Sequence, residues 1–141
     1  MKKVSKKLTL TDVGKNNSHL SAIRIPASVV GSEVLPELSK EELNPKLDLV
    51  FYDENGKGWV FQYIYYNDKY HGKPARLSHN EYRLSRVRDY IRAYALEEED
   101  EIWFSIDDND VRRVGFVKKE VPQEENDGII HIKGGWKIFE Y

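Results

Sequence analysis

The chain has 141 residues, of which 40% are hydrophobic, 33% charged and 12% aromatic, and its formal net charge is −2 at pH 7. This length and composition indicate one folded domain and exclude a disordered chain, which would carry fewer apolar and aromatic residues. The absence of cysteine excludes a disulfide framework and cysteine-based zinc sites. The basic first residues lack the apolar run of a signal peptide, and no stretch approaches the roughly 20 apolar residues of a membrane span. We therefore expect a soluble intracellular domain.

The first half of the chain is dominated by strand patterns. Alternating apolar and polar residues, rich in β-branched and aromatic types, predict strands at 6–10, 21–25, 47–53 and 59–67. Pro26 ends the second of these, and Asn55-Gly56 between the third and fourth is a strong hairpin signal. Residues 27–30 and 39–43 are short helical candidates, the latter because Ser39 and Glu42 have capping-box spacing.

The second half predicts one helix among further strands. Residues 81–86 form a short strand pattern, and in residues 87–96 apolar side chains recur on one helical face. Residues 101–106 and 111–119 predict a hairpin around an acidic turn, and residues 129–133 and 136–141 predict another around Gly134-Gly135. Seven or more strands with only short helices predict an all-β barrel or sandwich. Because the chain ends within a predicted strand, we expect residues 1–141 to be one domain of a longer polypeptide.

Motifs for catalysis are absent from the sequence. The histidines, His19, His71, His79 and His131, lack the spacing of a metal site, and no nucleophile elbow, phosphate-binding loop or dinucleotide fingerprint is present. A magnesium-dependent nuclease needs converging carboxylates and a lysine. Asp53, Glu54 and Lys57 come nearest, but they lie in the predicted hairpin turn, where a solvated tip is the simpler interpretation. We expect no catalytic centre in this chain.

The charges are unevenly distributed. Acidic residues cluster at 39–43, 96–101, 107–110 and 123–127, whereas basic residues gather at the amino terminus and between Lys69 and Arg92. A basic surface on a nearly neutral body is typical of nucleic-acid binding. Scattered solvent-facing charge would give the same counts, so both interpretations stay open on charge alone.

Residues 80–86, NEYRLSR, carry the most specific pattern. On a strand, Glu81, Arg83 and Ser85 share one face, and Tyr82, Leu84 and Arg86 the other. In the major groove a carboxylate accepts from cytosine N4, and an arginine donates to guanine O6 and N7. The pair on one face could therefore read neighbouring C and G bases. The alternative is an intrachain ion pair, worth roughly 0–1 kcal/mol at a surface.

Further short motifs stand in order across residues 8–119. They are Asp12 and Gly14 before a strand ending in Ile25-Pro26, then Tyr65-Tyr66-Asn67, Gly72-Lys73, and Asn80, Glu81, Arg83, Ser85, Arg86. This series resembles the plant B3 DNA-binding domains. It is more similar still to their bacterial relatives in restriction endonucleases, above all the amino-terminal effector-binding domain of EcoRII-type enzymes. The insert at 74–79 makes the gap between Gly-Lys and Asn-Glu longer than in that pattern.

The resemblance implies a seven-stranded DNA-binding pseudobarrel that grips the major groove with two arms, residues 11–21 and 67–86. It implies these DNA-contacting residues: Lys15, Asn16, Asn17, Ser18 and His19 in the first arm, and Asn67, Lys69, Lys73, Arg76, His79, Asn80, Glu81, Arg83, Ser85 and Arg86 in the second. Within this set, the resemblance implies that the base readers are Asn80, Glu81, Arg83 and Arg86. Contacts to base edges determine which sequence is bound, whereas contacts to phosphates position the protein on the duplex.

The function that we expect is sequence-specific binding of double-stranded DNA in a bacterial cytoplasm, with no membrane partner. The resemblance implies the effector or target-recognition domain of a type II (type IIE) restriction endonuclease with a CCWGG-like site. DNA binding itself would need no cofactor, and Mg²⁺ would serve only a covalently linked nuclease domain.

Other functions remain open at this point. One is a B3-like regulator, and another is the recognition domain of a phospholipase-D-type restriction enzyme. From other classes come a small-molecule-binding β-barrel, with the tyrosine-rich strand 59–66 lining a cavity, and a nuclease in its own right.

Overall fold

The computed structural model describes residues 2–14, 22–68, 70–72, 80–119, 129–132 and 135–139. The elements over these residues are β1 (Lys2–Lys7), α1 (Leu10–Val13), β2 (Ala22–Ile25), β3 (Lys46–Tyr52), β4 (Gly58–Tyr66), β5 (Glu81–Ser85), α2 (Val87–Ala93), β6 (Glu101–Ile106), β7 (Arg112–Val117), β8 (Ile129–Ile132) and β9 (Trp136–Phe139). The expected all-β architecture with short helices is confirmed. Among the described residues, no helix is long and apolar enough to span a membrane.

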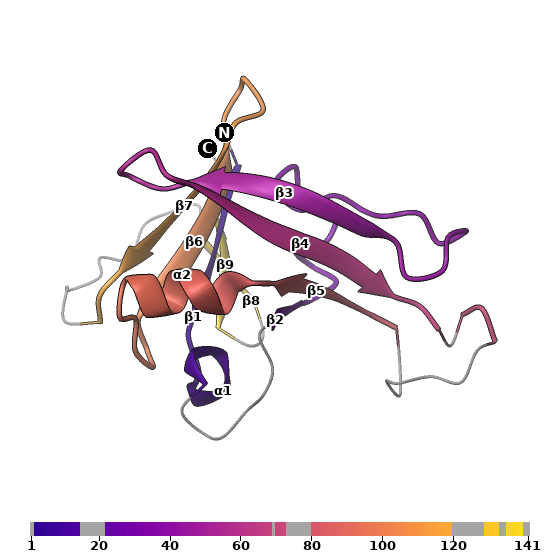
Figure 1. Ribbon diagram of the computed structural model, residues 1–141, viewed down its shortest axis with the longest axis horizontal. Helices are drawn as coiled ribbons and strands as arrows, with labels where there is room; N and C mark the ends of the chain where they lie inside the picture. The colour runs from indigo at the N-terminus through magenta and orange to yellow at the C-terminus, as the bar shows by residue number, and fades with distance from the viewer. Residues whose placement is uncertain are drawn as a thin grey trace.

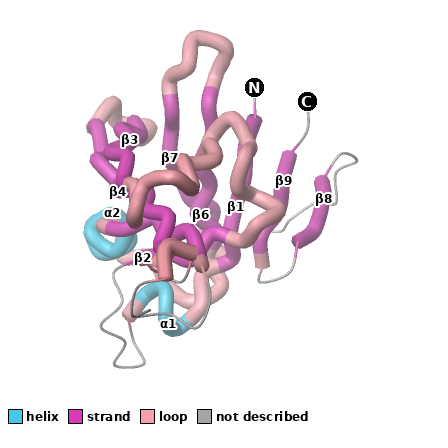
Figure 2. Tube along the Cα trace, turned by 90° about the vertical axis from the view of Figure 1, so that its right-hand side faces the viewer, coloured by secondary structure: helices cyan, strands magenta, loops and turns pink. Residues whose placement is uncertain are grey.

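The strands form one curled sheet in the order β2-β5-β4-β3-β7-β6-β1-β9-β8 (Figures 1 and 2). The described part of this sheet holds nine strands, where seven were expected. Neighbouring strands are antiparallel except β3 and β7, which are parallel and pair only at Phe51–Arg112 and Tyr52–Arg113. This short contact joins the two halves of the sheet, so the barrel is only partly closed.

Aromatic rings fill the space between the halves. Phe51 of β3 packs edge-on against Phe104 of β6, with ring centroids 5.4 Å apart, and Phe61 lies 5.4 Å from Phe51. Tyr90 of α2 meets Trp59 of β4 in another edge-to-face contact. Burying rings of this size supplies most of the core energy of a small domain. The apolar helical face predicted for residues 87–96 is thus confirmed by its packing against the sheet.

The short helices expected at 27–30 and 39–43 are wrong, because residues 27–44 consist of turns and bends. Ser39 accepts from the backbone N–H of Glu41 at 3.2 Å, which is not the bond of a capping box. The segment is held by tertiary contacts: Val34 and Leu35 are fully buried, and the Leu38 N–H donates to the Tyr82 hydroxyl at 2.9 Å. Such contacts outweigh weak helix propensity.

The strand expected at 6–10 is shifted toward the amino terminus. β1 ends at Lys7, and Thr9 instead caps α1, since its hydroxyl accepts from the Asp12 N–H at 3.2 Å and the Asp12 carboxylate accepts from the Thr9 N–H at 3.0 Å. This reciprocal capping box begins a helix at the place where the alternating pattern predicted more strand.

The β3–β4 turn is organised around the Asp53 carboxylate. The backbone N–H groups of Asn55 and Lys57 donate to it at 2.9 and 3.0 Å, the Trp59 indole donates at 3.0 Å, and the Tyr94 hydroxyl also donates. The bonds from Trp59 and Tyr94, and then those from the backbone, lower the pKa of Asp53 to about 2. Asp53 is therefore a turn anchor, which is not the exposed carboxylate that a nuclease site requires.

We predict that Asp53→Asn lowers the free energy of unfolding at pH 6 by about 1–3 kcal/mol, because the surrounding donors lose their charged acceptor. The folded-state pKa lies below the unfolded value of about 3.9. The contribution of Asp53 is therefore complete above about pH 4 and disappears as the pH falls toward 2. Urea unfolding at pH 6 and pH 2.5, with Glu41→Gln at an exposed position as control, checks this. A gap between wild type and variant that does not shrink at pH 2.5 would contradict it.

Candidate nucleic-acid interface

β5 lies between β2 and β4 in the sheet, and its two faces have different surroundings. Leu84 is fully buried, and the Tyr82 ring stacks on Tyr65 with centroids 4.3 Å apart. The predicted orientation of Tyr82 and Leu84 toward the core is confirmed. Glu81 and Arg83 therefore occupy the opposite, polar face of the sheet.

Glu81 is engaged within the protein. Its Oε2 accepts from Arg83 Nε at 2.7 Å, and Arg24 Nε lies 3.9 Å from the same oxygen. The side chain of Glu81 is only 6% exposed. The sequence left two alternatives open for Glu81 and Arg83, contacts with bases or an intrachain ion pair. The structure contains the intrachain ion pair. In this geometry Glu81 is a residue that holds Arg83.

The structure adds Arg24 to the candidate residues. Arg24 of β2 lies directly opposite Arg83 of β5 in the strand register, and its side chain is 63% exposed. The Arg83 side chain is 21% exposed, with its guanidinium over the Tyr66 ring at 5.7 Å. The sequence contained a signal for Arg24, since Ile23 and Ile25 alternate with it, but the pairing of β2 with β5 brings the two arginines together.

Asn67 was predicted to contact DNA but is fully buried. Its side-chain oxygen accepts from the Asn44 N–H at 2.7 Å, its amide nitrogen donates to the Glu42 carbonyl at 2.8 Å, and its own N–H donates to the Asn44 side chain at 2.8 Å. With these groups satisfied, Asn67 ties residues 42–44 to the end of β4. Asn67 is therefore a positioning residue.

Three more of the predicted residues can be located. Ser85 donates to the Gln62 carbonyl at 3.2 Å, which connects β5 to β4. Arg86 is exposed and takes the left-handed conformation, φ 71°, at the start of α2. Asn80 precedes β5, and its side-chain oxygen is buried with no hydrogen-bond partner among the residues that the structure describes. The other predicted residues, Lys15, Asn16, Asn17, Ser18, His19, Lys69, Lys73, Arg76 and His79, lie outside the described residues.

α1, which contains the first residues of the first predicted arm, lies beside α2. Arg88 of α2 donates from Nη2 to the Thr11 carbonyl at 3.1 Å, and Lys6 forms a buried ion pair with Asp12. Gly14 ends α1 with φ 79°, and a Cβ there would lie 3.1 Å from Cζ of Arg88. Because α2 follows β5 almost directly, these contacts place α1, β2 and β5 on one side of β4 (Figure 1).

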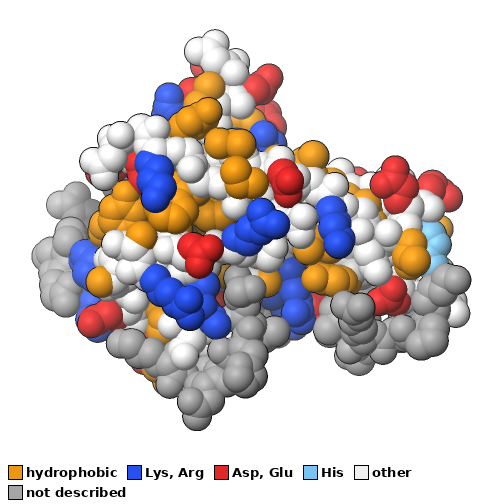
Figure 3. All heavy atoms as spheres, viewed as in Figure 1, with side chains coloured by type: hydrophobic (Ala, Val, Ile, Leu, Met, Phe, Trp, Pro, Cys, Tyr) orange, Lys and Arg blue, Asp and Glu red, His pale blue; other side chains and the backbone are white. Residues whose placement is uncertain are grey.

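A groove of about 350 Å³ adjoins Arg24 and Glu81. Its lining includes Arg24, Glu37, Lys40, Asn80 and Glu81. Figure 3 shows Lys and Arg side chains spread over the face formed by α2, β4 and β5, with acidic side chains between some of them. The groove and this face together form a polar, partly cationic surface.

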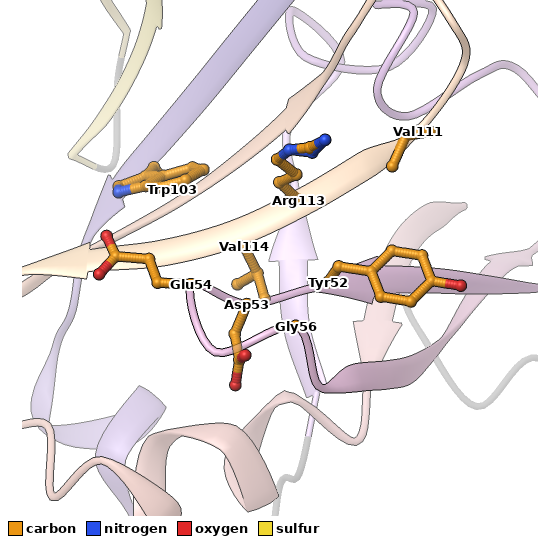
Figure 4. A pocket seen from close by; sticks show the side chains of 8 residues that line it. All are labelled: Tyr52, Asp53, Glu54, Gly56, Trp103, Val111, Arg113 and Val114. Atoms are coloured by element: carbon orange, nitrogen blue, oxygen red, sulfur yellow. The ribbon is translucent and has the colours of Figure 1, made fainter.

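A second hollow, about 380 Å³, lies between the β3–β4 turn and β7 (Figure 4). Trp103, Tyr52 and Arg113 are in its wall, while the Asp53 carboxylate points away from it. No residue of β4 lines it, and Phe61 and Tyr63 of β4 are fully buried in the core. At Phe61 and Tyr63 the inside of the barrel is therefore filled with side chains, whereas Tyr65 of the same strand lines the groove beside Arg24. Among the described residues, no three His, Asp or Glu side chains gather as a metal site would require.

Comparison with solved structures identifies the architecture. The chain is similar to the DNA complex of FUS3 from Arabidopsis, with a TM-score of 0.60 and 22% identity over 81% of this chain and 94% of that one. It is also similar to the DNA complex of the transcription factor LEC2 from Arabidopsis thaliana, with a TM-score of 0.59 and 19% identity over 82% and 94%.

The fold is a B3-type pseudobarrel. No family model and no curated protein matches the chain. The link to EcoRII-type enzymes thus depends on the sequence motifs alone, whereas the pseudobarrel is established by the structure.

We predict that Glu81 and Arg83 are coupled in this pseudobarrel. A double-mutant cycle of Glu81→Ala and Arg83→Ala should give a coupling free energy of about 1–3 kcal/mol, because a buried carboxylate loses a charged donor. The matched control is the pair Asp107 and Arg113, 3.4 Å apart with an arginine side chain 49% exposed, which should couple by less than about 1 kcal/mol. Urea unfolding measures the coupling free energy in both cycles. Equal values in the two cycles would contradict the conclusion that Glu81 holds Arg83.

Proposed function

We propose that the chain is a sequence-specific double-stranded DNA-binding domain that reads the major groove. One observation carries this proposal: Arg24 and Arg83 lie opposite each other on neighbouring strands of a B3-type pseudobarrel. Both predicted arms adjoin this pair in sequence, since residues 11–21 end directly before β2 and residues 67–86 include Arg83. FUS3 and LEC2, which have this fold, are seen in complex with DNA.

Arg83 is the best candidate for a base reader. The bond to Glu81 uses its Nε, so the two Nη groups keep a forked pair of donors for an outside acceptor. Guanine presents O6 and N7 to such a fork in the major groove. Fixing the guanidinium between Glu81 and the Tyr66 ring reduces the rotamer entropy that binding would cost. In this mechanism Glu81 aims the arginine and does not touch DNA itself.

The remaining cations supply affinity. Arg24 and the arm residues Lys15, Lys69, Lys73 and Arg76 are suited to phosphate contacts, which set the register of the protein on the duplex without reading sequence. Small polar residues of the arms, Asn16, Asn17, Ser18, His19, His79 and Asn80, can reach base edges or phosphates. A chain with net charge −2 depends on this local concentration of cations, because its overall field does not attract DNA.

The biological setting that we propose is recognition within a type II restriction endonuclease in a bacterial cell, with a CCWGG-like target and a linked Mg²⁺-dependent nuclease domain. The sequence motifs of residues 8–119 support it. A DNA-binding regulator is the alternative, supported by the likeness to the transcription factor LEC2. The polypeptide encoded around this chain separates them, since only the first requires a nuclease domain.

Selection of bound duplexes from a random pool tests the DNA-binding function. We expect enrichment of a short motif containing G·C pairs, and an affinity that falls linearly on a log–log plot against salt. Binding that shows the salt dependence without an enriched motif would contradict sequence-specific recognition. Loss of both would contradict DNA binding altogether.

We predict that Arg83→Ala weakens binding to the selected duplex by about 1–3 kcal/mol and relaxes selection at one base pair. Arg113→Ala, which removes the same charge from β7, should change neither quantity. Fluorescence anisotropy on selected and random duplexes provides the measurement. An equal loss on both duplexes would assign Arg83 to phosphate binding.

A further inference from the structure

The edge of β3 is open over most of its length. β4 pairs with it from Lys46 to Tyr52, whereas β7 reaches only Phe51 and Tyr52 (Figure 1). In the described sheet, no strand pairs with the other side of residues 46–50. Open strand edges carry unpaired backbone groups and are the places where another chain can add a strand.

The direction of these backbone groups follows from the hairpin bonds. Asp53 N–H donates to the Lys57 carbonyl at 2.9 Å, and Tyr65 N–H donates to the Pro45 carbonyl at 3.1 Å. In an antiparallel ladder the bonding alternates along the strand. The odd-numbered residues of β3 therefore bond to β4, and Lys46, Asp48 and Val50 direct their N–H and C=O groups outward.

The side chains along this edge are accessible and partly apolar. Leu47 is 39% exposed and Val50 is 42% exposed. Lys46 and Asp48 are exposed as well, on the face opposite Leu47. An edge with exposed leucine and valine side chains gains from being covered, whereas charges on an edge ordinarily oppose association.

The charges on this edge are complementary to their own copy. Two copies of β3 related by a two-fold axis pair in an antiparallel way. Their outward N–H and C=O groups can bond to each other only in registers that place even-numbered residues opposite even-numbered residues. Centring the pair on Lys46 opposes two lysines, and centring it on Asp48 opposes two aspartates. Placing the axis at Leu47 sets Lys46 of each copy opposite Asp48 of the other copy. Opposite charges across strands stabilise, and like charges destabilise, so among these three registers the charges favour the one centred on Leu47.

We propose that the chain self-associates by antiparallel pairing of β3 with β3 of a second copy, centred on Leu47. The N–H and C=O groups of Lys46 form hydrogen bonds with the C=O and N–H groups of Asp48 in the second copy. Asp48 forms the same bonds with Lys46 of the second copy. The two Leu47 side chains meet at the axis, on the face opposite the charged pairs. The contact is isologous and closes on itself, so it forms a dimer and no further chain. It is separated from the Arg24–Arg83 pair by β4, which lies between β5 and β3 in the sheet.

Charge reversal tests the proposed register. In sedimentation equilibrium at low salt, Lys46→Asp alone and Asp48→Lys alone should each weaken dimerisation by about tenfold, because both cross-axis pairs become like-charged. The double variant K46D/D48K should recover wild-type association, since the pairs are re-formed with their signs exchanged. Lys40→Asp makes the same change of charge away from the edge and should have no effect.

Hydrogen exchange gives a second readout. The Asp48 amide should become protected as protein concentration rises, whereas the Leu49 amide, bonded to β4, should be protected at every concentration. A chain that stays monomeric up to about millimolar concentration, or a dimer unaffected by the single reversals, would overturn the proposal. Protection of Asp48 by added duplex at low protein concentration would assign the edge to DNA and overturn it equally.

Discussion

The pairing of β5 with both β2 and β4 is the constraint on which the candidate interface depends. Leu84 and the stacked Tyr82 fix one face of β5 to the core, so the period of the strand directs Glu81 and Arg83 to the other face. The same pairing brings Arg24 opposite Arg83. A shift of one residue would place the arginine in the core and leucine in solvent, at a cost that the hydrophobic packing does not allow. The interface is thus a consequence of core packing.

Most of the architecture was predictable because strand periodicity is local. The β3–β4 hairpin, the β6–β7 hairpin and α2 follow directly from alternation, from Asn55-Gly56 and from the helical spacing of Tyr90 and Ile91. The errors arose where distant contacts decide the local conformation. Residues 27–44 stay irregular because Val34 and Leu35 are buried and Tyr82 binds the backbone of Leu38.

The site was less predictable than the fold, because polar residues look alike in sequence whether buried or exposed. Asn67 stands at a strand end and has a residue type suited to DNA contacts, yet its amide holds residues 42–44 in place. Glu81 could equally have faced DNA or Arg83, and only the geometry distinguishes the two. Arg24 was overlooked because the sequence does not tell which strand lies beside β5. These three residues differ in burial and in partners, which are properties of the tertiary structure.

A division of the surface follows from this arrangement. The face around β2 and β5 carries paired guanidinium groups, one held by a buried carboxylate, and it adjoins both predicted arms. The edge of β3 carries exposed leucine and valine with self-complementary charges, and it lies two strands away. The two surfaces differ in charge and shape, and the two proposals assign a polyanion to one of them and a second copy to the other.

NMR titration of the arginine side chains is the most direct measurement of the central claim. The Nε–Hε signals of Arg24, Arg83 and Arg113 can be followed while a duplex obtained by selection is added. The structure predicts that the signals of Arg24 and Arg83 shift and saturate together, while that of Arg113 stays in place. Movement of Arg113 with Arg24 and Arg83 unchanged would place the DNA on another face and contradict the account.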